Sequence, residues 1–469
     1  MRQKTMTVIG NDDLNLMLVE SVASVDDINA RFYGRFPYPW TPVKFDYLED
    51  AGFETVMLNQ NLGDWEHRTV RPAAKIWVAG CGTNQAVFTA LRFPAATVVG
   101  SDVSQQSLQL CRHAAKALNL SNLELREESL NNVSYKDQFD YVICTGVIHH
   151  NADPQATLAK LASALKPDGI MELMVYNHYH WVIPVALQRA VRIMCRSSES
   201  LNLELELSTV KNILNDLPKH SVMVRTQGKL LRKSEEALAD ALMQPVLYNY
   251  TVESLEQMAD SCGLELLVPC LNQFDKASGN LSWHMRFEEP ALRDLYASLP
   301  DTQRWQVTNL LSLQEGPQLW FYLQRKNSGR ARKSEQQICE EFLDVVFARN
   351  RTMQCSYIRT EDGRYQLLSN PIPYPIAPPN KEVERIFQAV DGETSMRRIF
   401  EQLEIETSFE IVNDVRLKLT TSAFPYLRAV PHAAKKDNAA VEERSGERES
   451  MQESNYRKFK RIKPRTFTV

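Results

Sequence analysis

Apolar and polar residues follow two different patterns along the chain. Between Lys75 and Asn177, apolar runs of strand length are separated by stretches in which apolar residues recur at helical spacing. Strands are expected at KIWVAG, ATVVGSD, NLELREES, FDYVICTG and IMELMVYN. One intervening helix should run from Ser104 to about Leu118. Another should begin after Asp153, with Pro154 as its first residue, and end at KPDG. This alternation is typical of a parallel sheet covered by helices on both faces, so the fold class is doubly wound α/β.

The rhythm changes after Asn177. Residues 181–243 have helical periodicity, many charges and no strand pattern, which predicts an inserted helical cap. The α/β pattern then returns in YTVESLEQMADSCGLELLVPC and ends in PQLWFYLQRK. We expect these segments to supply the last two strands of the same sheet, which then has seven strands.

Composition shifts suggest where the domains divide. The stretch NSGRARKSEQQ is poor in apolar residues and mixed in charge, as linkers between domains are. We therefore predict an N-terminal arm or lid (1–70), a main α/β domain (71–326) and a small C-terminal α+β domain (338–430). The remainder (431–469) is charged and poor in aromatic residues, which predicts disorder.

Overall composition narrows the classes of partner. Of the 469 residues, 43% are hydrophobic and 24% are charged, and the formal net charge is -4, so we expect no nucleic-acid partner and no membrane partner. The chain shows neither a membrane-length apolar run nor an apolar signal core near its start, which predicts a cytoplasmic protein. The eight cysteines form no CxxC pair, so we expect neither a zinc site nor a disulfide framework.

The stretch KIWVAGCGTNQAV is the strongest candidate for a binding site. Gly80 and Gly82 follow a predicted strand and precede a helix, so the backbone can approach a ligand closely and direct free N–H groups at it. Asp102 closes the next strand, where a carboxylate can accept hydrogen bonds from both hydroxyls of a ribose. Gln85 stands where a dinucleotide fingerprint has its third glycine. A nucleoside without phosphates is therefore favoured, and a nicotinamide-dependent oxidoreductase is the weaker alternative.

The segments IWVAGCGTNQA, VVGSDVS, FDYVICTGVIHH and LKPDGIMELMVYN, in this order, resemble the motifs of class I S-adenosylmethionine-dependent methyltransferases. In bacterial members a tyrosine-proline-tyrosine-proline-like segment precedes the core, and FPYPW (residues 36–40) stands in that place. The resemblance implies a seven-stranded Rossmann-like sheet and S-adenosylmethionine as cofactor. It also implies contacts of Gly80, Cys81 and Gly82 with the methionine portion, of Asp102 with the ribose, of Val103 with adenine, and of Thr145 and Gly146 with the cofactor at the end of the fourth strand. Ser129 stands where the family often has an acid for the adenine amino group, with Glu128 beside it.

Methyl transfer requires an aligned nucleophile, and an oxygen or nitrogen nucleophile must also lose a proton. The candidates for this work follow strand ends: His149 and His150 after the fourth strand, and Tyr176 and His178 after the fifth. Alternatively, one histidine of the first pair orients the loop or caps the next helix, and Tyr176 packs under the cap. The spacing of His178 and His180 could suit a metal, but no third ligand is evident nearby, so we predict none.

Two further segments allow a functional and a structural interpretation. RFYGRFPYPW is either a lid over the cofactor, with a hydroxyl from Tyr33 or Tyr38, or an aromatic staple that seats the N-terminal arm. IFQAVDGETSMRRIFEQL weakly resembles the winged-helix modules of some bacterial protein methyltransferases and peptide-modifying enzymes. The alternative for this small domain is a structural or dimerisation module, and a homodimer would follow from the latter.

Together these patterns predict a methyltransferase that modifies an oxygen or nitrogen of a small, natural-product-like molecule. One alternative is a peptide or protein acceptor held partly by the C-terminal domain. Another is a catalytically silent regulatory protein that binds S-adenosylmethionine, an option that rests on the residue at Ser129.

Overall fold

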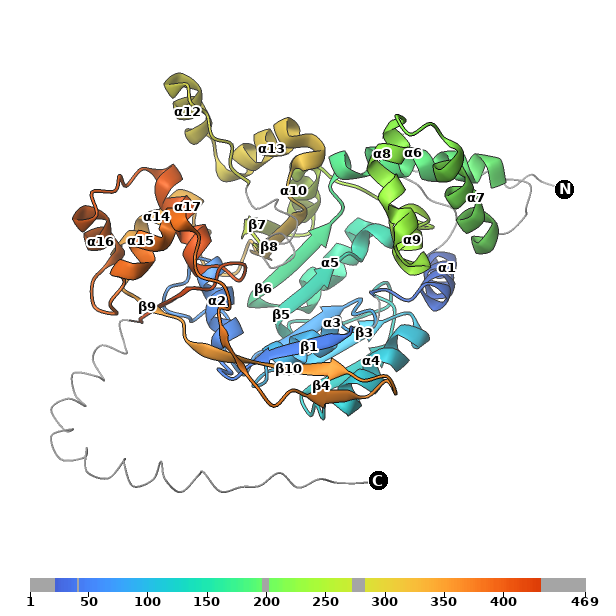
Figure 1. Cartoon of the computed structure of the whole chain (residues 1–469), viewed down its shortest axis with the longest axis horizontal. Helices are drawn as coiled ribbons and strands as arrows, with labels where there is room; N and C mark the ends of the chain where they lie inside the picture. Colours follow the sequence, from blue (N-terminus) through green and yellow to red (C-terminus); the bar gives the residue numbers. More distant parts are fainter. Residues whose placement is uncertain (1–21, 40–41, 196–201, 272–282, 432–469) are drawn as a thin grey trace.

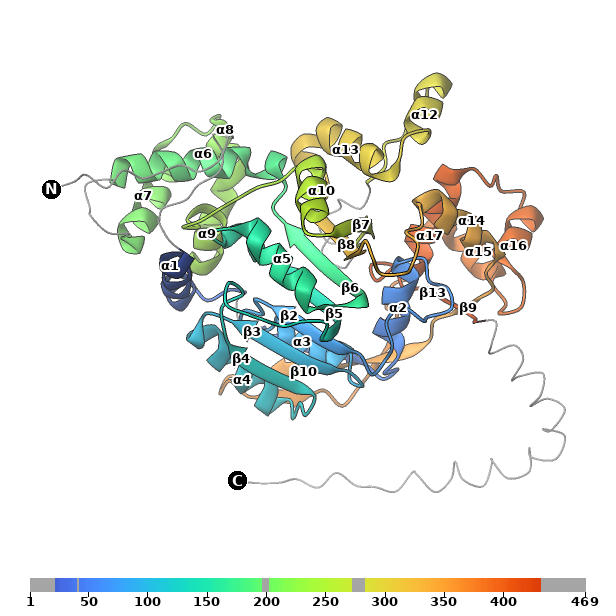
Figure 2. The ribbon, with the colours of Figure 1, turned by 180° about the vertical axis from the view of Figure 1, so that it is seen from behind.

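The computed structural model describes residues 22–39, 42–195, 202–271 and 283–431. Its centre is a seven-stranded sheet with the strand order β4-β3-β2-β5-β6-β8-β7 (Figures 1 and 2). The strands are β2 (Lys75–Ala79), β3 (Thr97–Asp102), β4 (Leu123–Glu127), β5 (Phe139–Thr145), β6 (Leu165–Val175), β7 (Leu264–Pro269) and β8 (Leu319–Arg325). All seven lie where the apolar runs predicted strands, which confirms the α/β class.

The sheet is mixed rather than wholly parallel. From β4 to β6 neighbouring strands pair in parallel, whereas β8 pairs antiparallel with both β6 and β7. Strand β6 also begins at Leu165, so the KPDG segment that was expected to end a helix belongs to the strand. Leu165 pairs with Phe139 of β5, and because of this pairing β6 begins earlier in the sequence than the apolar run IMELMVYN.

Successive residues of the central strands face two different cores because strand side chains alternate. Ile76 and Val78 of β2 join a core with α3 (Gln85–Arg92) and α4 (Gln105–Ala117). Trp77 and Ala79 join the core on the other face. Helices α5 (Pro154–Ala164), α10 (Val252–Ser261) and α13 (Asp301–Ser312) contribute to that second core.

The predicted cap is helical throughout its described residues. Its helices are α6 (His178–Cys195), α7 (Leu203–Asp216), α8 (Val222–Gln227) and α9 (Glu235–Leu242), with the 3-10 turn η2 (Gly228–Arg232). They surround a separate apolar core that includes Phe32 and Phe36. Both phenylalanines belong to or directly follow α1 (Val22–Arg35), so this N-terminal helix packs with the cap.

The C-terminal part of the chain is built together with an N-terminal segment. Strand β1 (Lys44–Leu48) pairs antiparallel with β10 (Thr352–Arg359), with Lys44 opposite Ile358. The remaining elements of this small domain are α2 (Phe53–Asn61), α14 (Glu335–Asp344), β9 (Phe347–Arg349), β11 (Tyr365–Leu367), β12 (Ile372–Tyr374), α15 (Lys381–Ala389), α16 (Met396–Gln402), α17 (Phe409–Thr420) and β13 (Leu427–Ala429). Their apolar core is continuous with the α3 side of the large sheet.

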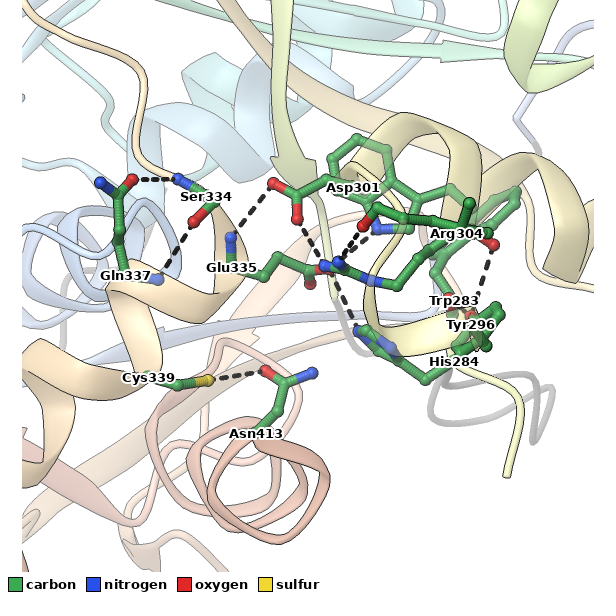
Figure 3. A network of polar contacts seen from close by, with 12 residues as sticks. Trp283, His284, Tyr296, Asp301, Arg304, Ser334, Glu335, Gln337, Cys339 and Asn413 are labelled. Atoms are coloured by element: carbon green, nitrogen blue, oxygen red, sulfur yellow. Dashed lines mark hydrogen bonds and ion pairs between the residues drawn. The ribbon is translucent and has the colours of Figure 1, made fainter. Parts of the chain in front are cut away.

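The junction between the two parts is a buried polar network (Figure 3). Glu335, at the start of α14, is 2% exposed and accepts a hydrogen bond from Trp305 Nε1 at 3.0 Å. His284 Nε2 lies 3.1 Å from its carboxylate, and Arg304 lies 3.5 Å away. Arg332, from the predicted linker, pairs with Asp301 at 3.1 Å. The segment that joins the two parts is thus anchored on α13, whose Trp305 packs against Phe321 of β8.

The other described helical elements are α12 (Pro290–Ala297) and the 3-10 turns η1 (Ile148–His150) and η3 (Leu313–Glu315). Among the described residues, no helix is both long enough and apolar enough to cross a membrane. The tail at 432–469, predicted to be disordered, lies outside the described residues.

Candidate active site

A cavity of about 540 Å³ lies at the carboxyl ends of β2 to β6. This is the edge at which open α/β sheets bind their ligands. Its walls come from the strand ends, from α1, from the segment before β1 and from helix α9 of the cap. Of the residues predicted for cofactor or catalysis, nine line it: Gly80, Cys81, Gly82, Asp102, Val103, Thr145, Gly146, His150 and Tyr176.

The glycine loop is held tightly from two sides. Gly80 has a φ of 74° and Gly82 a φ of 54°, both in the left-handed region that favours glycine. A Cβ on Gly80 would lie 2.5 Å from the Val147 side chain, and one on Gly82 would lie 2.6 Å from the Tyr38 carbonyl oxygen. The loop therefore needs glycine at both positions. Its N–H groups are not free, as the sequence suggested, because those of Gly80 and Cys81 donate to the Ser101 carbonyl oxygen at 2.8 Å and that of Gly82 donates to Asp102.

Asp102 is fixed at the end of β3 by two backbone donors. Gly82 N donates to its Oδ2 at 2.8 Å and Ser104 N donates to its Oδ1 at 2.8 Å. Burial raises the pKa of Asp102, and these backbone N–H groups act in the opposite direction by stabilising the carboxylate. Each oxygen keeps a lone pair, so the carboxylate suits the two hydroxyls of a ribose.

The adenine side differs by one residue from the expectation. Ser129 does not line the cavity, because its hydroxyl turns to donate to Asp26 Oδ2 at 2.6 Å. Glu128 lines the cavity instead, with Val103 and Leu130 nearby in the wall. An acid is thus present where the sequence suggested that it was missing. The predicted strand NLELREES ran to Ser129, whereas β4 ends two residues earlier, at Glu127.

The expected methionine end is lined by Thr145 and Gly146, and Gln85 Nε2 donates to Thr145 Oγ1 at 2.6 Å. Cys81 is also part of the wall, but contact with the Cys111 side chain and burial raise the pKa of its thiol. A thiol in this state is a poor nucleophile.

The four predicted catalytic residues are placed differently from one another. His150 lines the cavity, and its Nδ1 lies 2.7 Å from the Val246 carbonyl oxygen, which makes Nδ1 the protonated nitrogen. Burial lowers the pKa of His150 to about 4, so the ring is neutral near pH 7. Its Nε2 has no hydrogen-bond partner among the described residues. This nitrogen is itself buried, so His150 contributes a neutral ring to the wall.

His149 and His178 lie outside the cavity wall. His149 is fully buried and packs against the ring of Tyr176 at a centroid distance of 3.8 Å, and burial lowers its pKa well below the usual value. His178 Nδ1 lies 2.7 Å from Asn249 Oδ1, and His180 Nε2 lies 2.9 Å from the Gly316 carbonyl oxygen. Both members of the HxH pair thus have protein partners. Within the described residues, no group of three or more potential ligands is arranged for a metal.

The aromatic segment before β1 covers the glycine loop. Tyr33, Tyr38 and Pro39 line the cavity, and the Thr83 hydroxyl donates to the Pro39 carbonyl. Tyr176, on the same cavity, stacks on Trp181 at 3.9 Å. The segment combines both interpretations of the sequence, because its tyrosines face the cavity while its phenylalanines pack into the cap. Trp40 lies outside the described residues.

Sequence reasoning missed Asp240, which helix α9 places in the cavity wall. Gln244 Nε2 donates to Asp240 Oδ1 at 2.8 Å and to the Tyr33 hydroxyl at 3.2 Å. Burial raises the pKa of Asp240 to about 7. In the sequence, Asp240 is one acid among several in a charged helical stretch, and nothing local sets it apart.

This site can be set beside known proteins. A family model described as "Methyltransferase domain" matches residues 75–237, which include the glycine loop, Asp102 and the strand ends around the cavity. The segment is a class I methyltransferase domain. Its cofactor is S-adenosylmethionine, and the left-handed glycines and the held carboxylate of Asp102 fit that molecule.

Relatives of the methyltransferase domain are distant and match in part. An uncharacterized protein of Synechococcus is 26% identical over 243 residues, which are 50% of this chain and 57% of that protein. A ubiquinone biosynthesis O-methyltransferase of Dinoroseobacter shibae is 38% identical over 139 residues, or 29% of this chain and 52% of that enzyme. The chain thus spans little more than half the length of these curated relatives.

A likeness in fold reaches beyond the methyltransferase domain. The solved structure of PKMT2 from Rickettsia typhi in complex with AdoHcy has a TM-score of 0.52 and 14% identity. It covers 81% of this chain and 76% of that one. At this identity the likeness shows the fold alone, and it includes much of the chain outside residues 75–237.

Proposed function

We propose that the protein transfers the methyl group of S-adenosylmethionine to an oxygen or nitrogen nucleophile that enters the cavity. The observation that carries this proposal is the arrangement of Asp102 and Gly82 at the cavity wall, where one carboxylate is held by the loop that faces the cofactor's place. S-adenosylmethionine supplies an electrophilic methyl carbon when it is bound. The chain itself must hold the two reactants in line and keep water away.

Named residues can do this positioning. Asp102 would hold the ribose, and the backbone of the glycine loop would approach the methionine portion. Tyr38 and Pro39 close over that loop and exclude water from it. His150, whose ring is neutral near pH 7, forms part of the wall around the acceptor molecule.

We favour a small molecule, or a single side chain, as the acceptor. The cavity must also hold the cofactor, so its volume leaves room for a modest group only. Every described residue that lines it comes from the part of the chain up to Trp320. The small C-terminal domain therefore contributes no described residue to the wall, which weakens the alternative in which that domain grips a peptide at the site. The presence of Glu128 in turn weakens the alternative of a silent regulatory protein.

Calorimetric titration with S-adenosylhomocysteine tests the proposal. We expect binding with a micromolar Kd for the unaltered protein and at least about tenfold weaker binding for Asp102→Ala, because the ribose loses its main acceptor. NAD serves as the control ligand and should not bind. Equal affinity of both proteins for S-adenosylhomocysteine would contradict the site assignment, and tight NAD binding would favour the oxidoreductase alternative.

A further inference from the structure

One acid in the cavity differs from the others in how its oxygens are used. Asp102 is held by Gly82 and Ser104, and Glu128 accepts a hydrogen bond from the Tyr135 hydroxyl at 2.7 Å. Asp26, likewise in the wall, accepts from the side chains of Ser129 and Asn131. Asp240 accepts one hydrogen bond, from Gln244 at Oδ1. Among the described residues, its Oδ2 has no hydrogen-bond donor and its carboxylate has no basic partner.

A carboxylate withdrawn from water without a cation is costly in its charged form. The raised pKa of Asp240 expresses this cost. The cationic side chain that shares the cavity wall, Arg92, lies 3.8 Å from Glu54 on α2 and forms no described pair with Asp240. A ligand that brings a positive charge to Asp240 would remove the cost, whereas a neutral alcohol would not.

The rings around Asp240 favour the same kind of ligand. Tyr33, Tyr38 and Tyr176 line the cavity with it, and the Asp240 charge acts on all three phenols, since it helps to raise the pKa of each. Aromatic faces attract ammonium ions and their methylated forms. The ring of Tyr176 is already packed between His149 at 3.8 Å and Trp181 at 3.9 Å. Asp240 therefore provides a counter-ion, and Tyr33 and Tyr38 provide aromatic rings, for one alkylammonium group.

We propose that the acceptor is an alkyl amine whose nitrogen lies against Asp240, beside Tyr33 and Tyr38, and that Asp240 accepts its proton. This inference rests on the proposed function. Asp240 takes one proton from the ammonium, which leaves a neutral amine. The amine's lone pair then forms the N–C bond to the methyl carbon while the C–S bond breaks and its electron pair stays on sulfur. S-adenosylhomocysteine and a methylated ammonium result. Because the pKa of Asp240 is raised toward 7 by burial, the carboxylate is a stronger base than an exposed one.

A positive charge near Asp240 could instead come from the sulfonium of the cofactor. The two sources are distinguished by the ratio of the affinities for S-adenosylmethionine and S-adenosylhomocysteine, since only the first carries a sulfonium. We expect Asp240→Asn to leave this ratio unchanged within about twofold. A clear loss of preference for S-adenosylmethionine in the variant would overturn the proposal and assign Asp240 to the cofactor.

The amine itself can be tested without knowing the acceptor. The probes are three analogues of S-adenosylmethionine in which a nitrogen replaces the sulfur and the methyl is replaced by a short chain ending in an ammonium, a hydroxyl or a methyl group. Calorimetry should show that the ammonium chain binds about tenfold or more tightly than the hydroxyl chain, and that Asp240→Asn abolishes this preference. Equal binding of the ammonium and hydroxyl chains by the unaltered protein would overturn the proposal.

Two controls separate this inference from the proposed function. Unchanged binding of S-adenosylhomocysteine by Asp240→Asn shows that the variant is folded and that the cofactor site is intact. If neither the unaltered protein nor the variants bind S-adenosylhomocysteine, the proposed function is wrong, and the inference is wrong with it. Glu236→Gln, on the same helix but outside the cavity wall, should keep the preference for the ammonium chain.

Discussion

Gly82 lies where three parts of the site meet. Its backbone is left-handed, its N–H holds Asp102, and the Tyr38 carbonyl oxygen stands against its Cα. A side chain at this residue would have to displace the segment before β1 or shift the glycine loop. Either movement would alter the position of the Asp102 carboxylate, which the Gly82 N–H holds.

For this reason we expect Gly82→Ala to lower the affinity for S-adenosylhomocysteine by about tenfold or more and to reduce stability by about 1–3 kcal/mol. Gly263→Ala is the matched control, because Gly263 has a similar φ of 71° but nothing within 4 Å of its would-be Cβ. Gly263→Ala should lose a similar amount of stability, because its backbone is also left-handed, and it should keep its affinity for S-adenosylhomocysteine. Calorimetry and urea unfolding measure both quantities, and equal affinity losses in the two variants would contradict the role of the close contact.

Residues of the site were predictable from the sequence where local structure places them. The glycine loop and Asp102 were found because a strand, a turn and a helix position them within one βαβ unit. Asp240 was not found, because only the packing of the cap brings α9 to the cavity. Ser129 and Glu128 show why residues at a strand end are hard to assign from sequence. An error of one residue in the position of the strand end changes which side chain lines the cavity.

At the scale of elements, β1 is supported by aromatic packing on both sides. Phe45 is fully buried and lies 4.7 Å from the Phe88 ring of α3 and 5.0 Å from the Tyr365 ring of β11. The strand therefore fastens the small sheet to the helix that follows the glycine loop. Phe88 also lines the cavity, so this packing reaches the site.

We expect Phe45→Ala to lower the free energy of unfolding by about 3–5 kcal/mol, as removal of a buried phenylalanine does. The control is Val43→Ala two residues earlier, where the side chain is 70% exposed and the loss should stay within about 0.5 kcal/mol. Urea unfolding at pH 7 compares the two. A loss below about 1 kcal/mol for Phe45→Ala would show that β1 is not part of the cooperative core.

The elements themselves were more predictable than their pairing. Most strands of the large sheet are buried, near-continuous apolar runs, and for this reason they were located. Strand β4 has no buried residue and was located by its place in the alternation of strands and helices. The reversed direction of β8 was not predicted, and neither was the pairing of Lys44 with Ile358, because partners so far apart in sequence leave no local pattern. The short KFDYL run was accordingly assigned to an arm.

At the scale of the whole molecule, Glu335 ties the methyltransferase domain to the small domain. Burial alone would raise its pKa, but His284, Arg416 and Arg304 together outweigh burial and lower the pKa of Glu335 to about 2. Arg416 lies on α17, and Arg304 lies on α13. The carboxylate thus neutralises charges from both parts of the chain.

Removing this charge should destabilise the molecule in a pH-dependent way. The folded pKa lies below the value of about 4.3 for an unfolded chain, so the contribution of Glu335 is complete above that pH and is lost as the pH falls toward 2. We expect Glu335→Gln to lower the free energy of unfolding by about 3–5 kcal/mol at pH 7, because the buried arginines lose their partner. Between pH 5 and pH 3 the difference from the unaltered protein should narrow by about 1–2 kcal/mol.

Urea unfolding at pH 7, 5 and 3 measures this. Glu340→Gln is the control, since the Glu340 side chain is 68% exposed in its pair with Arg397 and should change stability by less than about 1 kcal/mol. A difference for Glu335→Gln that is the same at pH 3 as at pH 7 would show that the charge of Glu335 is not what joins the two parts.

The pairing of β1 with β10 also determines when β1 can fold during synthesis of the chain. Lys44 leaves the ribosome long before its partner Ile358, and at about 5–20 residues per second the wait is roughly 15–60 s. During that interval the nascent chain can form part of its central sheet, but β1, which follows the segment over the glycine loop, has no strand to join. A chain released in this state would expose an unpaired strand edge, which is prone to aggregate. The segment over the glycine loop is thus fastened through β1 only after synthesis has reached β10.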